Sequence, residues 1–225
     1  MDRIAKALAK ERVVLASTSP RRIELLRQLG CKDVDVVPSN FKEDLPKNSM
    51  SPFEYVVDTA KGKAMSVYKA TMDDLIPPKL VIAADTVILR GSEILEKPKN
   101  EVDHFIGLQK LRDHKGPHQV LTAVVCVAPL DEPVSPGYCV KTHLESTEVY
   151  FDPDTSDDFL KNYVESGEAK DAAGGYKIQG VGALLISKIN GDYNNVIGLP
   201  LLATWKLMGS TMFDQELDSD AEDRF

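Results

Sequence analysis

The stretch VVLASTSPRRIELL, residues 13–26, decides how the rest of the chain is organised. Its first four residues are small or branched and apolar, as in a buried strand. Ser19 then offers an N-cap and Pro20 suits the first helical position, so the pattern predicts a strand followed directly by a helix. Arg21 and Arg22 fall in the first turn of that helix, where the helix dipole favours anions and disfavours cations. An anion bound at the same helix end would compensate both arginines, so the stretch indicates a phosphate site.

Two interpretations of the arginine pair stay open at this point. The simpler one is an exposed pair that forms ion pairs with neighbours such as Glu24. The functional one gains support from the hydroxyls of Ser17, Thr18 and Ser19, which surround the same helix end.

Length and composition limit what the whole molecule can do. The chain has 225 residues, of which 43% are hydrophobic, and this is enough for a sizeable core in one main domain. We expect an N-terminal extension at 1–12, the folded domain at 13–209 and an acidic tail at 210–225. The formal net charge of −8 disfavours nucleic acid as a partner. No apolar run approaches the length of a membrane span, so we expect no membrane association.

Cysteine usage indicates a reducing compartment. The three cysteines, Cys31, Cys126 and Cys139, form no CxxC pair, which argues against a disulfide framework and against a zinc site. The first ten residues are too charged for a signal peptide and predict a short amphipathic helix, with a mitochondrial presequence as the alternative. We therefore expect a cytoplasmic protein.

Further elements follow from apolar periodicity and from helix signals. A capping box, SPFE at 51–54, predicts a helix that stops before Pro77. The pattern also predicts strands at 34–37, 79–84, 87–89, 94–95, 120–127, 140–150 and 184–189, and helices that begin near 100, 155 and 198. Several of these strands form hairpins, so the expected fold is α/β with a mixed sheet.

Candidate chemistry gathers at loops and strand ends. Asp85 ends an apolar strand, where open α/β sheets place ligand crevices, and it could hold a metal or accept a proton from water. A turn-capping role for Asp85 is the alternative, and solvent exposure is the alternative for Glu43, Lys63 and Lys97. Together with the two arginines and the glycine-rich segment 165–180, these residues suit a polyphosphate with a divalent cation.

Several other classes of site lack their signatures. The histidines at 104, 114, 118 and 143 show no metal-ligand spacing, and we interpret them as surface or structural residues. The patterns GxxxxGK[ST] and GxGxxG are absent, which excludes a P-loop enzyme and disfavours a dinucleotide-binding protein.

The motifs, taken in order, resemble the Maf-like nucleoside triphosphate pyrophosphatases over roughly residues 13–208. The opening stretch carries the first motif, and the resemblance continues through FKE at 41–43, AKGKA at 60–64, AADTV at 83–87, ILEKP at 94–98, SGE at 166–168, DAAGGYKIQG at 171–180 and GDYNNVIGLP at 191–200. The resemblance implies an α/β fold of the Maf/ITPase-like type, in which a long curved mixed sheet with flanking helices forms two lobes around a nucleotide cleft.

The resemblance also implies hydrolysis of a nucleoside triphosphate to the monophosphate and diphosphate, with magnesium or manganese. Asp85 matches the proton acceptor and, with Glu43, the metal-binding carboxylates. The remaining active-site positions match Ser17, Arg22, Lys63 and Lys97, whereas base choice is assigned to Arg21, Thr86 and Gln179. Glutamine at 179 is similar to the branch that acts on dTTP and UTP. A homodimer is a further family expectation.

Some positions depart from the family pattern. Ala83, Glu96 and Lys177 stand where glycine is usual, and Ala172 stands where lysine is common. Glu96 and Lys177 add opposite charges near the site. The alternatives are the same chemistry on a modified purine or methylated guanosine triphosphate, and a nucleotide-binding regulator without turnover. The joint presence of Asp85, Glu43, Lys63 and Lys97 favours the enzyme.

Overall fold

A seven-stranded mixed sheet forms the centre of the protein in a computed structural model that describes residues 3–46, 49–95, 97–132 and 134–213. The strand order is β2-β1-β3-β5-β6-β7, and β4 pairs with β3. The bounds are β1 Val13–Leu15, β2 Asp35–Val36, β3 Leu80–Arg90, β4 Glu93–Leu95, β5 His118–Pro129, β6 Tyr138–Phe151 and β7 Ile186–Asn190. β1 is parallel to β2 and β3, and every other pairing is antiparallel. The mixed α/β sheet expected from the sequence is confirmed.

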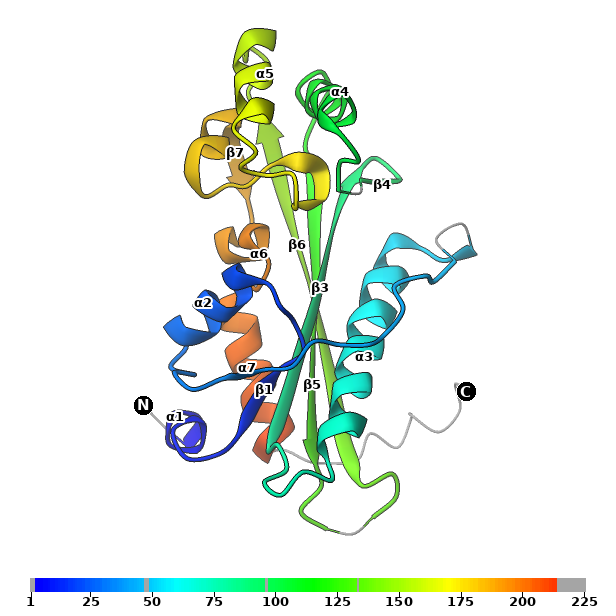
Figure 1. Ribbon diagram of the computed structural model, residues 1–225, viewed down its shortest axis with the longest axis vertical. Coiled ribbons are helices and arrows are strands. Elements are labelled where there is room, and N and C mark those ends of the chain that lie inside the picture. The colour runs from blue at the N-terminus through cyan, green and yellow to red at the C-terminus, as the bar shows by residue number, and fades with distance from the viewer. Residues whose placement is uncertain (1–2, 47–48, 96, 133, 214–225) are drawn as a thin grey trace.

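Helices cover both faces of this sheet (Figure 1). Their bounds are α1 Arg3–Leu8, α2 Pro20–Gln28, α3 Pro52–Thr71, α4 Glu101–Arg112, α5 Asp157–Glu165, α6 Tyr193–Ile197 and α7 Leu201–Phe213, with short 3₁₀ turns η2 Ala173–Gly175 and η3 Gly180–Leu185. The long α3 lies alone on one face, and α1, α2 and α7 lie on the other. The helices α4 and α5 pack at the far end of the sheet (Figure 1). None of the described helices is long and apolar enough to cross a bilayer.

Alternation along β3 divides the core between the two faces. Leu80 and Ile82 pack with α2 and α7, whereas Val81 and Ala83 pack against α3. Successive side chains of a strand point to opposite faces, so Asp85 must face α3 and Thr86 must face the other side. The apolar run of β3 is therefore what a strand covered on both faces requires.

Along the edge that faces away from β5, strand β3 changes its pairing partner. On this edge β1 pairs with residues 80–82 and β4 pairs with residues 88–90. Within the described part of the chain, the residues between them, 83–87, have no strand partner on this side. Asp85 and Thr86 lie at the centre of this interval, so both are accessible from the space between β1 and β4.

The strands expected at 79–84 and 87–89 are one strand, β3, so Asp85 lies within a strand and not at its end, because residues 85 and 86 pair with β5 as their neighbours do. The other differences from the expected elements lie near the C-terminus. The strand expected at 184–189 is β7, which begins at Ile186 because the preceding residues form the 3₁₀ turn η3. The helix expected from 198 to 208 is α7, which begins at Leu201 and continues to Phe213, and it is preceded by a helix that the sequence did not predict, α6, capped by Asp192. α6 has only five residues and is too short to show apolar periodicity. α7 extends further because Thr211 and Met212 are buried.

Candidate active site

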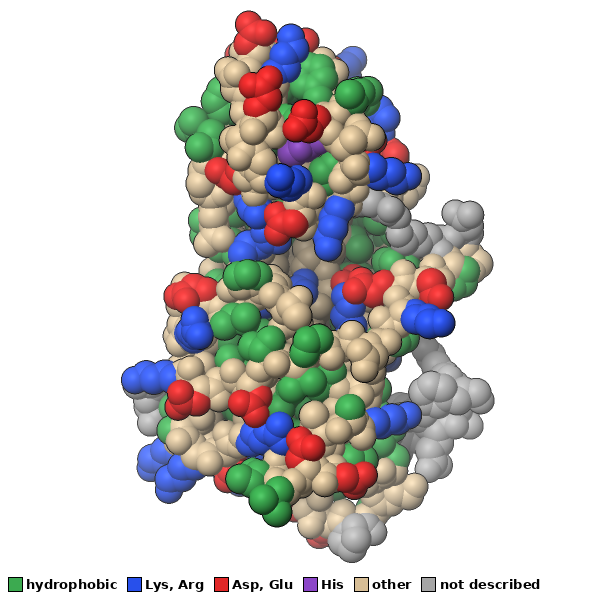
Figure 2. Space-filling view, in the orientation of Figure 1, with side chains coloured by type: hydrophobic (Ala, Val, Ile, Leu, Met, Phe, Trp, Pro, Cys, Tyr) green, Lys and Arg blue, Asp and Glu red, His purple; other side chains and the backbone are tan. Residues whose placement is uncertain are grey.

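One cavity of about 620 Å³ opens at the middle of the molecule, between β1 and β4. Figure 2 shows it as a hollow with acidic and basic side chains on its rim. All nine residues predicted from the sequence line it: Ser17, Arg21, Arg22, Glu43, Lys63, Asp85, Thr86, Lys97 and Gln179. They come from six separate parts of the chain, so only the folded protein brings them together.

The α3 side of the cavity is ionic. The Lys63 ammonium lies 2.8 Å from Asp85 Oδ1 and 3.0 Å from Glu43 Oε2. The side chains of Lys63 and Asp85 are only 12% and 11% exposed, whereas that of Glu43 is 55% exposed. Asp85 is therefore a buried carboxylate whose charge is balanced by Lys63. Glu43, the second partner of Lys63, is exposed to solvent.

A close contact with α3 holds the loop that carries Glu43. The ring of Phe41 lies so near Gly62 that a Cβ added there would stand 2.3 Å from the ring. Only glycine allows this approach. The motifs FKE and AKGKA therefore fit each other: Phe41 packs at Gly62 and thereby brings Glu43 to Lys63.

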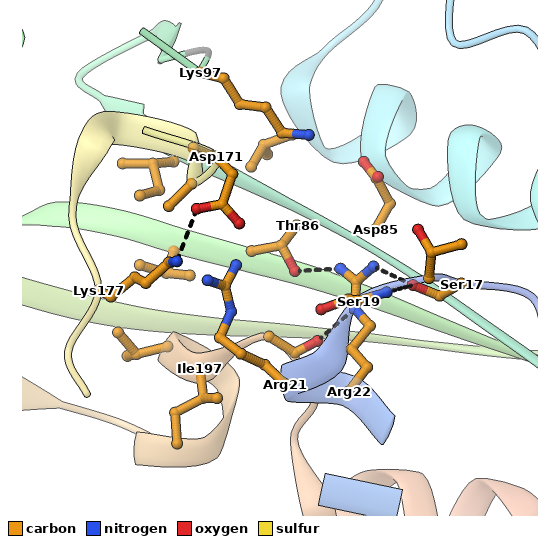
Figure 3. A pocket seen from close by; sticks show the side chains of 18 of the residues that line it. Ser17, Ser19, Arg21, Arg22, Asp85, Thr86, Lys97, Asp171, Lys177 and Ile197 are labelled. Carbon is orange, nitrogen blue, oxygen red and sulfur yellow. Dashed lines mark hydrogen bonds and ion pairs between the residues drawn. The ribbon is translucent and has the colours of Figure 1, made fainter. Parts of the chain in front are cut away.

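The opposite side of the cavity is built from hydrogen bonds around Arg22 (Figure 3). Arg22 Nε donates to the carbonyl of Gly198 at 3.0 Å, Nη2 donates to Thr86 Oγ1 at 2.9 Å and Nη1 donates to Ser17 Oγ at 3.4 Å. A guanidinium has five N–H donors, so these described partners engage three of them and two remain for a ligand. Burial lowers the pKa of Arg22 and the charge of Asp85 partly restores it, but arginine stays protonated.

The start of α2 differs in one detail from its prediction. Ser19 has the extended backbone of an N-cap, but its side chain makes no capping hydrogen bond. Its backbone N–H instead donates to Ser17 Oγ at 3.2 Å. The helix begins where expected, but the predicted side-chain cap is wrong, because the Ser19 hydroxyl accepts no hydrogen bond from the first turn of α2.

A third wall comes from residues 171–179 of the glycine-rich segment. Asp171 and Lys177 form an ion pair of 2.7 Å, and Arg21 points toward them (Figure 3). The hydrogen bond from Lys177 lowers the pKa of Asp171, and Arg21 adds to the effect. Lys177 was expected to bring extra charge near the site, and the structure places it in the cavity lining. Lys97 extends over the cavity from the segment after β4 (Figure 3). Glu96 lies outside the described residues.

Polar contacts support this wall. Glu168 accepts hydrogen bonds from Tyr163 Oη and from the N–H groups of Val181 and Gly182. Burial opposes ionisation of Glu168, but these donors outweigh it and lower its pKa. His118 contacts Tyr176 Oη at 2.7 Å, and burial lowers its pKa to about 3, so it is neutral at pH 7.

His104 also has the structural role expected for it. His104 contacts the carbonyl of Gly175 at 2.5 Å and, like His118, supports the glycine-rich wall. In the described part of the chain, no group of three or more His, Cys, Asp or Glu residues is arranged to hold a metal alone.

Sequence reasoning missed several members of the site. Gly198 contributes its carbonyl to Arg22, Thr122 contacts Thr86 across the strands, and Asp171 pairs with Lys177. The motif GDYNNVIGLP was noted without a role for any of its residues. The signal that could have found Thr122 is a polar residue inside an apolar strand, because a buried hydroxyl needs a partner.

The cavity has cations on all its walls and a carboxylate pair on one, a lining that suits a phosphate-bearing anion. The sequence identifies the family: the chain matches the profile of the Maf-like protein family over residues 12–211 and belongs to that family.

Named relatives agree with this assignment. A dTTP/UTP pyrophosphatase of Schizosaccharomyces pombe is 46% identical over 95% of this chain and 89% of its own length. A dTTP/UTP pyrophosphatase of Saccharomyces cerevisiae is 38% identical over 91% of this chain and 92% of its own length. Among solved structures, the Staphylococcus aureus Ham1 protein is 20% identical, covers 62% of this chain and 72% of its own, and has a TM-score of 0.37, which adds nothing to the fold described above.

Proposed function

We propose that this protein hydrolyses dTTP and UTP to the monophosphate and diphosphate. The proposal rests on the ionic group of Asp85, Lys63 and Glu43, of which Asp85 and Lys63 are largely buried, and which faces Arg22 across a cavity that Lys97 also lines. The names of the relatives at 38–46% identity support the same reaction and the same substrates. The proposal includes modified pyrimidine nucleotides as substrates. The biological role of the reaction would be to remove such nucleotides from cellular pools.

In the proposed reaction, a water oxygen attacks the α-phosphorus and passes its proton to Asp85. The bond between the α-phosphorus and the bridging oxygen breaks, and diphosphate leaves with the electron pair. Lys63, Arg22 and Lys97 neutralise the charge that develops on the leaving group. Lys63 bridges two carboxylates in the free protein, so a phosphate oxygen can take the place of one of them without leaving an uncompensated lysine.

A divalent ion fits the donor chemistry of the α3 side. Asp85 and Glu43 supply hard carboxylate oxygens on one wall, and magnesium sites commonly combine one or two carboxylates with substrate phosphates. We propose these two residues as the ligands of magnesium or manganese. When bound, the ion would supply Lewis-acid activation and charge neutralisation at the phosphates.

The proposed base-binding residues lie on the other walls. Arg21 and Thr86 line the cavity beside Arg22, and Gln179 lines it from the glycine-rich segment. The Gln179 amide both donates and accepts, so it can pair with the edge of a pyrimidine. The cytoplasm is the proposed compartment, because the three cysteines are free thiols in the structure. The homodimer stays a prediction.

A panel of triphosphates tests the proposal. Purified protein is incubated with magnesium and each of dTTP, UTP, dCTP, dGTP, a modified purine triphosphate and methylated GTP, and released diphosphate is measured. We expect release from dTTP and UTP only when magnesium or manganese is present. Fast purine turnover with inert pyrimidines would contradict the substrate assignment, and binding without turnover of any member would contradict the enzyme.

A further inference from the structure

A chain of hydrogen bonds runs from the cavity into the core. Arg22 Nη2 donates to Thr86 Oγ1 at 2.9 Å, and Thr86 Oγ1 lies 3.0 Å from Thr122 Oγ1. Thr122 Oγ1 donates in turn to the backbone carbonyl of Asn195 at 3.3 Å. Thr86 and Thr122 are directly opposite each other on β3 and β5, which brings their hydroxyls together.

The protons of this chain can point in one direction only. A carbonyl oxygen only accepts, so the bond between Thr122 and Asn195 uses the single proton of the Thr122 hydroxyl. Thr122 must then accept in its contact with Thr86, and the proton of that contact comes from Thr86. The order is Arg22 N–H to Thr86 O–H to Thr122 O–H to Asn195 C=O.

The inner end of the chain is fixed. Thr122 and Asn195 are both fully buried, so water does not compete for their hydrogen bonds. The Asn195 amide donates to the carbonyl of Val120 at 2.9 Å and to Thr147 Oγ1 at 3.0 Å. Thr147 in turn exchanges hydrogen bonds with the backbone of Asp192, the N-cap of α6. The carbonyl of Asn195 therefore stays in place as the terminal acceptor.

The outer end of the chain has one consequence for the ligand. A hydroxyl has one proton and two lone pairs. The Thr86 hydroxyl donates its proton to Thr122 and accepts a hydrogen bond from Arg22 with one lone pair. Its other lone pair is left to accept a hydrogen bond from a ligand in the cavity. Toward a ligand, Thr86 is an acceptor and not a donor.

We propose that Thr122 is a positioning residue for base selection: it fixes the Thr86 hydroxyl as an acceptor, and the site thereby selects a base with a ring N–H donor. Uracil and thymine carry such a donor at N3, whereas cytosine has a bare acceptor nitrogen there. An acceptor facing an acceptor leaves both groups unpaired, and sites of this kind reject the mismatched ligand strongly. This inference rests on the proposed function.

Substitution of Thr122 tests the inference. Thr122→Val keeps the shape of the side chain but removes the acceptor, which leaves the Thr86 proton free to turn toward the cavity. We expect the ratio of kcat/KM for dUTP to that for dCTP to fall roughly tenfold, through the change of one buried hydrogen bond. Thr122→Ser, which retains the hydroxyl, should restore the ratio.

A matched control separates this effect from loss of packing. Thr59 on α3 is also fully buried, and within the described residues its hydroxyl has no hydrogen-bond partner. Thr59→Val should leave the dUTP to dCTP ratio unchanged. A uniform loss on both substrates in Thr122→Val, or the same ratio in Thr122→Val and wild type, would overturn the inference.

A second measurement needs no variant. N3-methyl-dTTP lacks the ring N–H, and wild-type protein should turn it over at least about tenfold more slowly than dTTP. Equal turnover of dTTP, dCTP and N3-methyl-dTTP would overturn the inference while leaving the pyrophosphatase activity in place. Wild-type protein that is inert toward every triphosphate would instead refute the proposed function itself.

Discussion

Asp85 and Thr86 are neighbours in the chain, yet they belong to two different kinds of site. Asp85 faces α3 and forms an ion pair with Lys63, while Thr86 faces the other side of the sheet and joins a chain of neutral hydroxyls. The ionic side includes Glu43, which is half exposed and can exchange partners. The neutral side ends at Thr122 and Asn195, which are fully buried and cannot.

The difference separates two tasks that one cavity must perform. Groups that bind phosphate and move a proton need charge, and they must release their partners when a ligand arrives. Groups that distinguish one base from another need fixed donors and acceptors, because specificity depends on the cost of a mismatch. The alternation of β3 places the carboxylate of the first task and the hydroxyl of the second on opposite faces of the sheet, and Arg22 brings a phosphate-binding charge to the Thr86 side.

Removal of the Asp85 charge should have the largest effect. Asp85→Asn keeps the volume of the side chain but cannot accept the proton of water, so kcat should fall about 10³-fold for every substrate. Steady-state release of diphosphate measures it. Asp44→Asn, an exposed position beside Glu43, is the control and should retain full activity. Residual activity within a few-fold of wild type would contradict the role assigned to the ionic side.

The two arginines should respond differently if the tasks are divided as proposed. Arg22→Ala removes the hydrogen bonds to Ser17, Thr86 and Gly198 and should lower kcat/KM by about 10²-fold for all bases alike. Arg21→Ala should lower it by about tenfold and change the order of preference among bases. Equal losses for every base in both variants would show that Arg21 acts on phosphate as well.

Substitution at the contact between Phe41 and Gly62 should have the smallest effect of the three, and it tests the ionic side locally. Gly62→Ala places a methyl group against the Phe41 ring and should destabilise the protein by about 1–3 kcal/mol through overpacking. Denaturation in urea measures the change. The control is Gly107→Ala in α4, where nothing lies within 4 Å of the added Cβ and where alanine should stabilise by about 0.5–1 kcal/mol. A loss of turnover that exceeds the loss of folded protein would show that the contact positions Glu43 or Lys63 for the reaction.

Much of this arrangement could be predicted from the sequence because the signals are local. The apolar run before Asp85, the capping box at Ser51 and the proline after Ser19 each act within a few residues. Seven of the nine site residues are candidates from the sequence pattern itself, and the resemblance to a family adds Thr86 and Gln179 and assigns the roles. That resemblance identifies positions, and it does not show which residues touch.

What the sequence could not supply is register and partner choice. The pairing of Thr86 with Thr122 depends on how β3 and β5 align, and a shift of one residue would turn every side chain to the other face. The sequence likewise identified Ser19 as the N-cap of α2 but could not show that its hydroxyl makes no capping hydrogen bond. The bond from Arg22 to Gly198 spans 176 positions and leaves no local trace.

That same bond has a consequence for how the protein is made. Arg22 lies near the beginning of the chain and Gly198 near its end, and the cavity takes lining residues from the whole interval between them. Chains leave the ribosome N-terminus first, so the phosphate-binding arginine is synthesised long before its carbonyl partner. A growing chain therefore cannot complete this site until Gly198, directly after α6, has emerged.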